Sequence, residues 1–152
     1  MILTAIGLAT ASAFAGAALY INWCEHPARL SLNDAALLRQ WKESYARGFE
    51  MQASLALIAG ALGLAAYYFE QSFAAMLGGL LLLANWPYTL LAIIPTNRRL
   101  VATPNEEAGA DTRALLVKWG KLHALRTLLS IAGVAAFVTA IAMGGGGLNA
   151  RA

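Results

Sequence analysis

The sequence alternates between long apolar runs and shorter polar connections. Because the apolar runs are continuous, whereas a barrel strand would alternate over about 10 residues, they predict helices. Each run is long enough to cross a bilayer, which takes about 20 apolar residues. We expect an all-α fold, a four-transmembrane-helix bundle, with spans at approximately 2–23, 49–68, 73–94 and 127–145. The stretches without Asp, Glu, Lys or Arg are 1–24, 51–69, 71–97 and 127–150.

Segments of helical periodicity lead into the second and fourth spans. Asn33 or Asp34 can cap a helix that continues into the second span, and Asp111 can cap one that continues into the fourth. The second and fourth helices should therefore extend beyond the membrane into the cytoplasm, on the side assigned below.

The four prolines are expected to interrupt the helices. Proline removes a backbone N–H, and its ring clashes with the preceding helical turn. Pro27 and Pro95 should break the chain near the ends of the first and third helices, and Pro104 should break the third connection. Pro87 should kink the third helix.

Composition excludes a soluble domain. Of 152 residues, 59% are hydrophobic and only 12% are charged, whereas a soluble domain carries charge on about a quarter of its residues. The whole chain, residues 1–152, should form one integral membrane domain. A cleaved signal peptide is the alternative for residues 1–20, but no basic segment precedes the apolar stretch. The single cysteine, Cys24, excludes an intramolecular disulfide.

Basic residues are distributed asymmetrically. Ten of the eleven lie in the connections 24–50 and 96–126, and only Arg151 lies on the opposite side. The positive-inside rule therefore places both connections in the cytoplasm and both termini outside, as in a bacterial inner-membrane protein. The net charge of +3 is explained by this topology, and no basic run with an aromatic motif indicates nucleic acid. The expected partners are the lipid bilayer and a hydrophobic small molecule, and a homo-oligomer is left open.

Polar residues recur at helical spacing in the cytoplasmic half of every predicted helix. Because neighbouring helices run in opposite directions, these stripes should meet at one depth. Polar groups there are costly unless they face one another or a hydrated cavity, so they mark a candidate site. Alternatively, the charged members snorkel or pair at the interface. The stripes are Asn22, Glu25 and His26; Glu43, Arg47, Glu50 and Ser54; Asn85, Thr89 and Thr96; and Trp119, His123, Arg126 and Ser130.

The two histidines allow a metal site. His26 adjoins Glu25, and His123 lies one turn from Arg126. Two histidines with a carboxylate, Glu25 or Glu50, can bind iron or copper, and two histidines can hold a haem. No ligand pair has a diagnostic spacing such as H-x3-H. The sequence therefore leaves both a metal or haem site and a metal-free site open.

Four blocks of sequence carry a family resemblance. Together they resemble the anthrone oxygenase-like family, small four-helix membrane proteins long classed as a domain of unknown function, over nearly the whole chain. Members with an assigned role oxidise anthrones to anthraquinones. The blocks are Glu25-His26-Pro27-Ala28-Arg29-Leu30; Trp41-x3-Tyr45-x-Arg47-Gly48-x2-Met51-Gln52-Ala53; Asn85-Trp86-Pro87-Tyr88-Thr89 with Pro95-Thr96-Asn97; and Trp119-x3-His123-x2-Arg126-Thr127.

The resemblance implies an oxidoreductase that acts on an aromatic or quinol-like molecule with O2. An anthrone has an acidic methylene, so the reaction needs chiefly a base, an anion stabiliser and a dry pocket. We expect His123 as the base and Arg126 as the stabiliser, with His26 as a further catalytic candidate. The candidates for substrate binding are Asn85, Trp86, Trp41, Arg47, Gln52, Tyr45, Trp119 and Asn97.

No redox cofactor is strictly required by this chemistry, although iron, copper or haem can still be held by His26 and His123, with Glu25 as a further metal ligand. The alternative function is a non-enzymatic membrane component, either an assembly partner or a small transporter. A transporter usually carries acidic residues near the membrane midplane, whereas the carboxylates here lie toward one end.

Overall fold

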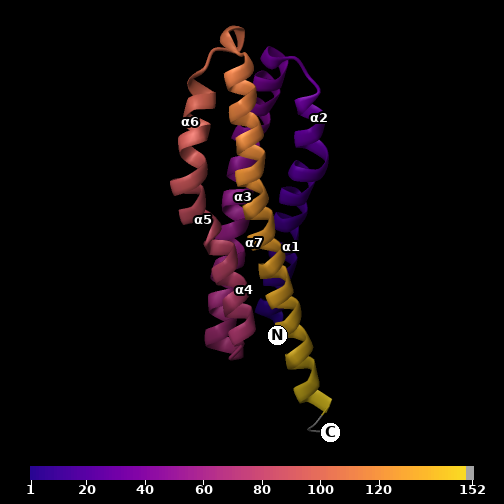
Figure 1. Cartoon of the computed structure of the whole chain (residues 1–152). Helices are drawn as coiled ribbons and strands as arrows, with labels where there is room; N and C mark the ends of the chain where they lie inside the picture. Colours follow the sequence, from indigo (N-terminus) through magenta and orange to yellow (C-terminus); the bar gives the residue numbers. More distant parts are fainter. Residues whose placement is uncertain (150–152) are drawn as a thin grey trace.

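The computed structural model describes residues 1–149, with side chains through residue 144, and this part of the chain is entirely helices and short turns (Figure 1). The elements form four rods that are long and apolar enough to cross a membrane, which confirms the all-α four-helix prediction. The first rod joins α1 (Ile2–Tyr20), the π-helical η1 (Ile21–Glu25) and α2 (His26–Leu30), and the second is α3 (Asp34–Glu70). The third joins α4 (Phe73–Leu83), α5 (Asn85–Tyr88), the π-helical η2 (Thr89–Ile93) and α6 (Ile94–Ala102); a short 3-10 helix, η3 (Asn105–Glu107), precedes the fourth, α7 (Ala110–Asn149).

Each rod packs against two neighbours. Helix α3 contacts α1 and α4, and α7 contacts the same two helices from the other side. Helices α3 and α4 approach each other closely where a Cβ atom on Gly63 would lie 2.7 Å from the Cα atom of Gly79. Glycine at this crossing lets the two backbones touch, as small residues do between membrane helices. The buried core between α1, α3, α4 and α7 includes Phe14, Leu82 and Phe137.

The second and fourth rods are longer than a membrane span. Helix α3 has 37 residues and α7 has 40, against the 20 or so that cross a bilayer. The predicted cap of α3 is confirmed, because the Asn33 side chain accepts a hydrogen bond from the Ala36 N–H at 3.0 Å. Helix α7 begins at Ala110, two residues earlier than a cap at Asp111 predicts, so Asp111 lies inside its first turn.

Two prolines do not break the chain as predicted. Pro27 and Pro95 each lie at the second position of an α-helical segment that directly follows a π-helical one. The wider π turn moves the backbone away from the proline ring and accommodates the missing N–H, so the helix continues. The first and third rods therefore reach Leu30 and Ala102, and the connections shorten to 31–33 and 103–109.

The third rod is interrupted beside Pro87. Helix α4 ends at Leu83, a turn at Ala84 follows, and the chain is offset at α5 (Figure 1). The Asn85 amide donates hydrogen bonds to the carbonyls of Leu81, at 3.2 Å, and Leu82, at 3.1 Å. This side chain thus satisfies backbone acceptors at the interruption predicted for Pro87.

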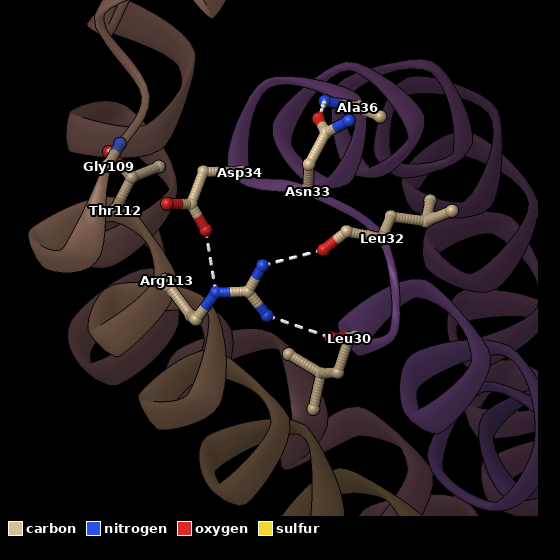
Figure 2. Close-up of polar contacts among 8 residues, drawn as sticks. All are labelled: Leu30, Leu32, Asn33, Asp34, Ala36, Gly109, Thr112 and Arg113. Atoms are coloured by element: carbon tan, nitrogen blue, oxygen red, sulfur yellow. Dashed lines mark hydrogen bonds and ion pairs between the residues drawn. The ribbon is translucent and has the colours of Figure 1, made fainter.

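The two short connections lie together at one end of the bundle. Arg113 of α7 donates to the Asp34 carboxylate at 2.6 Å and to the carbonyls of Leu30, at 2.8 Å, and Leu32, at 2.6 Å (Figure 2). It thereby satisfies carbonyls left unpaired where α2 ends. The N-terminus and the end of α7 lie at the opposite end (Figure 1). Arg151 lies outside the described residues.

Candidate functional site

A cavity of about 280 Å3 lies between η1, the first half of α3, the η2–α6 segment and α7. It brings together residues from all four rods that are far apart in the sequence. The predicted site residues that line it are Glu25, Tyr45, Gln52, Asn97, Trp119, His123 and Arg126.

Two predicted binding residues on α3 lie elsewhere. Trp41 is fully buried behind the cavity wall, where it stacks on Tyr45 with ring centroids 4.9 Å apart and meets Trp119 edge-on. Arg47 is exposed and does not line the cavity. The lining positions Tyr45, Gly48 and Gln52 recur at helical spacing, and position 47 falls off that face.

The two histidines pack on one indole ring. His26 lies 5.5 Å from Trp119 between ring centroids, and His123 stacks on Trp119 at 4.9 Å. Nε2 of His26 points at Gly120, where it would overlap an added Cβ atom, and His26 does not line the cavity. Both histidines therefore belong to one cluster, as predicted from their shared depth.

The predicted metal ligands do not converge. Glu25 forms an ion pair with Arg29. Among the described residues, no group of three or more His, Cys, Asp or Glu side chains could hold a metal ion. Nε2 of His26 faces Gly120 and Nδ1 of His123 is bonded to Asn22, so a shared ion could be bound only through Nδ1 of His26 and Nε2 of His123.

The hydrogen bonds of Asn22 fix the tautomer of His123. The Asn22 amide nitrogen donates to the Gly120 carbonyl at 3.1 Å, which only accepts, so its Oδ1 must face the opposite way. That oxygen lies 2.8 Å from Nδ1 of His123 and 2.7 Å from the Thr127 hydroxyl. Nδ1 of His123 therefore carries a proton, and the lone pair of a neutral imidazole resides on Nε2. His123 thus offers a base on a side chain that lines the cavity.

If His123 acts as a base, replacing Asn22 by leucine should reduce turnover without weakening substrate binding. Asn22 does not line the cavity, so its loss should lower kcat about ten- to a hundredfold through a misoriented His123 while KM changes little. Thr127→Val is the matched control, since it removes the other bond to Asn22 but leaves the bond to His123. Equal losses in both variants, or a change in KM alone, would contradict the positioning role.

Arg126 is a buried cation for which the described residues provide no partner. Its side chain is 8% exposed, and no hydrogen bond or ion pair joins its guanidinium to another described residue. Its guanidinium carbon lies 5.4 Å from the centroid of the Phe14 ring. By contrast, Arg29 is bound to Glu25 and, at 2.9 Å, to the Ser44 hydroxyl. An unpaired cation at such a depth is costly unless it faces an anion or a hydrated cavity.

The comparisons with known proteins place the chain in a family. The family model for anthrone oxygenases matches residues 41–136. The chain belongs to the anthrone oxygenase family. It is 33% identical to an anthrone oxygenase of Claviceps purpurea (strain 20.1) over 153 aligned positions, which cover 91% of this chain and 88% of that relative. No solved structure matches the chain.

The stretch matched by the anthrone oxygenase family holds most of the cavity. His123 and Arg126 lie within residues 41–136, whereas Asn22 and His26 precede that stretch. Phe14 and Ser44 were not predicted as site residues, because one is apolar within a span and the other is a single hydroxyl off the predicted stripe. Only the folded arrangement places them beside Arg126 and Arg29.

Asn85 and Trp86 line a second, smaller cavity of about 20 Å3. The two cavities share Phe49, Thr89 and Arg126 as walls. Polar atoms of Asn85, Trp86, Thr89 and Arg126 are buried there without a hydrogen-bond partner among the described residues. The space is close to the minimum that holds one water, so these two predicted binding residues adjoin the main cavity without lining it.

Proposed function

We propose that the protein is a membrane-embedded oxidoreductase that oxidises a hydrophobic aromatic or quinol-like molecule of the anthrone kind with O2. The observation that carries this proposal is the pairing, in one cavity, of a histidine base with an unpaired arginine. The base can remove an acidic C–H proton, and the arginine can stabilise the anion that forms. Family membership supports oxygenase chemistry in general.

The chemistry balances with O2 as the oxidant. His123 takes one proton from the ring methylene through Nε2, and the negative charge moves to the ring oxygen beside Arg126. The carbanion then gives electrons to O2, the new C–O bond forms at the former methylene, and the second methylene hydrogen leaves in water. Overall, one CH2 group and one O2 become one C=O group and one H2O.

The cavity walls suit an aromatic guest. Tyr45, Phe49 and Trp119 supply rings, and Ile93 supplies an aliphatic surface. A cavity of about 280 Å3 is near the lower end of the range for small-molecule sites, which begins at roughly 300 Å3. The carboxamides of Gln52 and Asn97 can hold the ring substituents. Apolar walls also exclude water, which strengthens the interaction of Arg126 with an anion.

The protein in lipid vesicles should convert an anthrone to its anthraquinone, with one O2 consumed per carbonyl formed. Under 18O2 the label should appear in the new carbonyl. Because anthrones react slowly with O2 unaided, empty vesicles and an anaerobic sample are the controls. A rate equal to that of empty vesicles, with the anthrone bound, would favour the non-enzymatic alternative.

Both termini should lie outside a bacterial inner membrane, with the connections 31–33 and 103–109 in the cytoplasm. Ten of the eleven basic residues support this orientation. A periplasm-active reporter fused after Ala152 should be active, and one inserted in the 103–109 connection should be inactive. The reverse pattern would overturn both the orientation and the assignment of the cavity to the cytoplasmic half.

A further inference from the structure

The walls of the main cavity differ in their exposure. All the lining residues from η2, α6 and α7 are buried, among them Asn97, His123 and Trp119. The lining residues from α1, η1 and α3 are mostly half-buried or exposed, and two of them, Tyr20 at 58% and Met51 at 49%, are largely accessible. The cavity therefore opens along the seam between the first rod and α3.

Both ends of the bundle are closed above and below the cavity. Toward the connections 31–33 and 103–109, a cluster that includes Leu37, Leu100 and Leu116 is fully buried. Toward the termini, the cluster that includes Phe14 and Phe137 is also fully buried. A guest of aromatic size cannot pass through a packed core of this kind, because interiors leave few voids larger than a water molecule. The most exposed lining residues lie along the seam, which makes it the most accessible route into the cavity.

The seam faces the bilayer. Beside it on the first rod, Leu19 and Trp23 are exposed, and exposed apolar side chains on a membrane-spanning helix contact lipid. Beside it on α3, Arg47 and Glu50 are exposed, and charged side chains reach for the headgroups. The opening therefore lies at the boundary between acyl chains and headgroups, where amphipathic aromatic molecules collect.

We propose that Tyr20, Gly48 and Met51 form a lateral portal through which a planar aromatic guest passes from the bilayer into the cavity. Only the aromatic class of the guest rests on the proposed function. Glu25 and Ser44 give the opening a polar edge, and Ala17, Tyr20 and Met51 give it an apolar one. A guest with a polar substituent on one side would therefore pass in a preferred orientation.

Gly48 is the residue that keeps the portal open. A Cβ atom added there would meet nothing within 4 Å, so no packing contact requires a glycine. Glycine inside a helix is less stable than alanine, and a larger side chain at this position would project into the opening. Gly16 is a matched control, since a Cβ atom added there on a helix would also meet nothing within 4 Å. It is exposed, whereas Gly48 is half-buried, and it does not line the cavity.

Stopped-flow quenching of tryptophan fluorescence tests the portal. The probe is 9,10-anthraquinone in phosphatidylcholine vesicles, and all samples carry Trp23→Phe, which removes an exposed indole. Trp119 in the cavity wall reports binding. Gly48→Leu should slow association by roughly tenfold or more, whereas Gly16→Leu should stay at the rate of the Trp23→Phe parent. Association of Gly48→Leu at the parent rate would overturn the portal.

A second measurement needs no change at Gly48. The association rate of the probe with the parent protein is followed as lipid is added at constant total probe. Lateral access predicts that the rate follows the mole fraction of probe in the bilayer; a rate that follows the aqueous probe concentration overturns the proposal. If Gly48→Leu does not fold, this titration by itself tests the portal. Saturable quenching without oxidation would contradict the proposed function and leave the portal standing. Absence of saturable quenching in the parent protein would reject the aromatic guest and, with it, the portal as proposed.

Discussion

Replacing His123 by alanine should lower the rate of oxidation by about a hundred- to ten-thousandfold, the usual contribution of a general base. The fold should survive, because Asn22 keeps the Thr127 hydroxyl as a hydrogen-bond donor when the imidazole is removed. Turnover of an anthrone in vesicles measures the loss, and circular dichroism with gel filtration checks the fold. Full activity in this variant would return His123 to a structural role.

His26→Ala is the matched control for His123→Ala. Both rings pack on Trp119, but only His123 lines the cavity. A cofactor-free base mechanism predicts that His26→Ala retains most of the activity. If the two histidines share a metal or haem, either substitution should remove both the bound group and the activity. Measuring bound iron and copper together with turnover in both variants separates these mechanisms.

The helical architecture could be predicted because it depends on composition over long windows. The four stretches without charge each correspond to a rod, since apolar segments of that length are stable only as helices in a bilayer. The cap at Asn33 was also readable, because a side chain that caps a helix acts on residues next to it in sequence. Features that depend on residues close together in the sequence can be predicted without knowing the fold.

The ends of the first and third rods could not be predicted. The prediction treated each proline as part of a regular α-helix, which a proline would break. Pro27 and Pro95 each follow a π-helical segment, and that local widening has no clear sequence signal. The non-helical connections consequently begin later than predicted, after Leu30 and Ala102, and the polar stripes lie on continuous helices. A fixed helical period also placed Arg47 in the site, although the face of α3 that lines the cavity excludes it.

The candidate site could be predicted in part. His123 and Arg126 were found because ionisable residues deep in a membrane helix are costly and mark function. Their partners could not be found in this way. Asn22 is 101 positions from His123, and the bond between them depends on how η1 and α7 pack. The absence of an acidic partner for Arg126, on which the proposed mechanism depends, is likewise visible only among the described residues of the folded chain.

Replacing Arg126 by alanine should lower kcat/KM by about a hundred- to a thousandfold, the range for loss of one group that stabilises a developing anion. Stability should not fall with activity, because a buried cation without a partner is itself unfavourable. Arg126→Lys should retain more activity than the alanine variant if charge alone matters, and little more if the guanidinium binds the anion at two points. Arg47→Ala, which removes an exposed arginine outside the cavity, should stay within about twofold of the wild type. A large drop in thermal stability for Arg126→Ala with unchanged kcat/KM would identify Arg126 as structural and remove the anion-stabilising step from the mechanism.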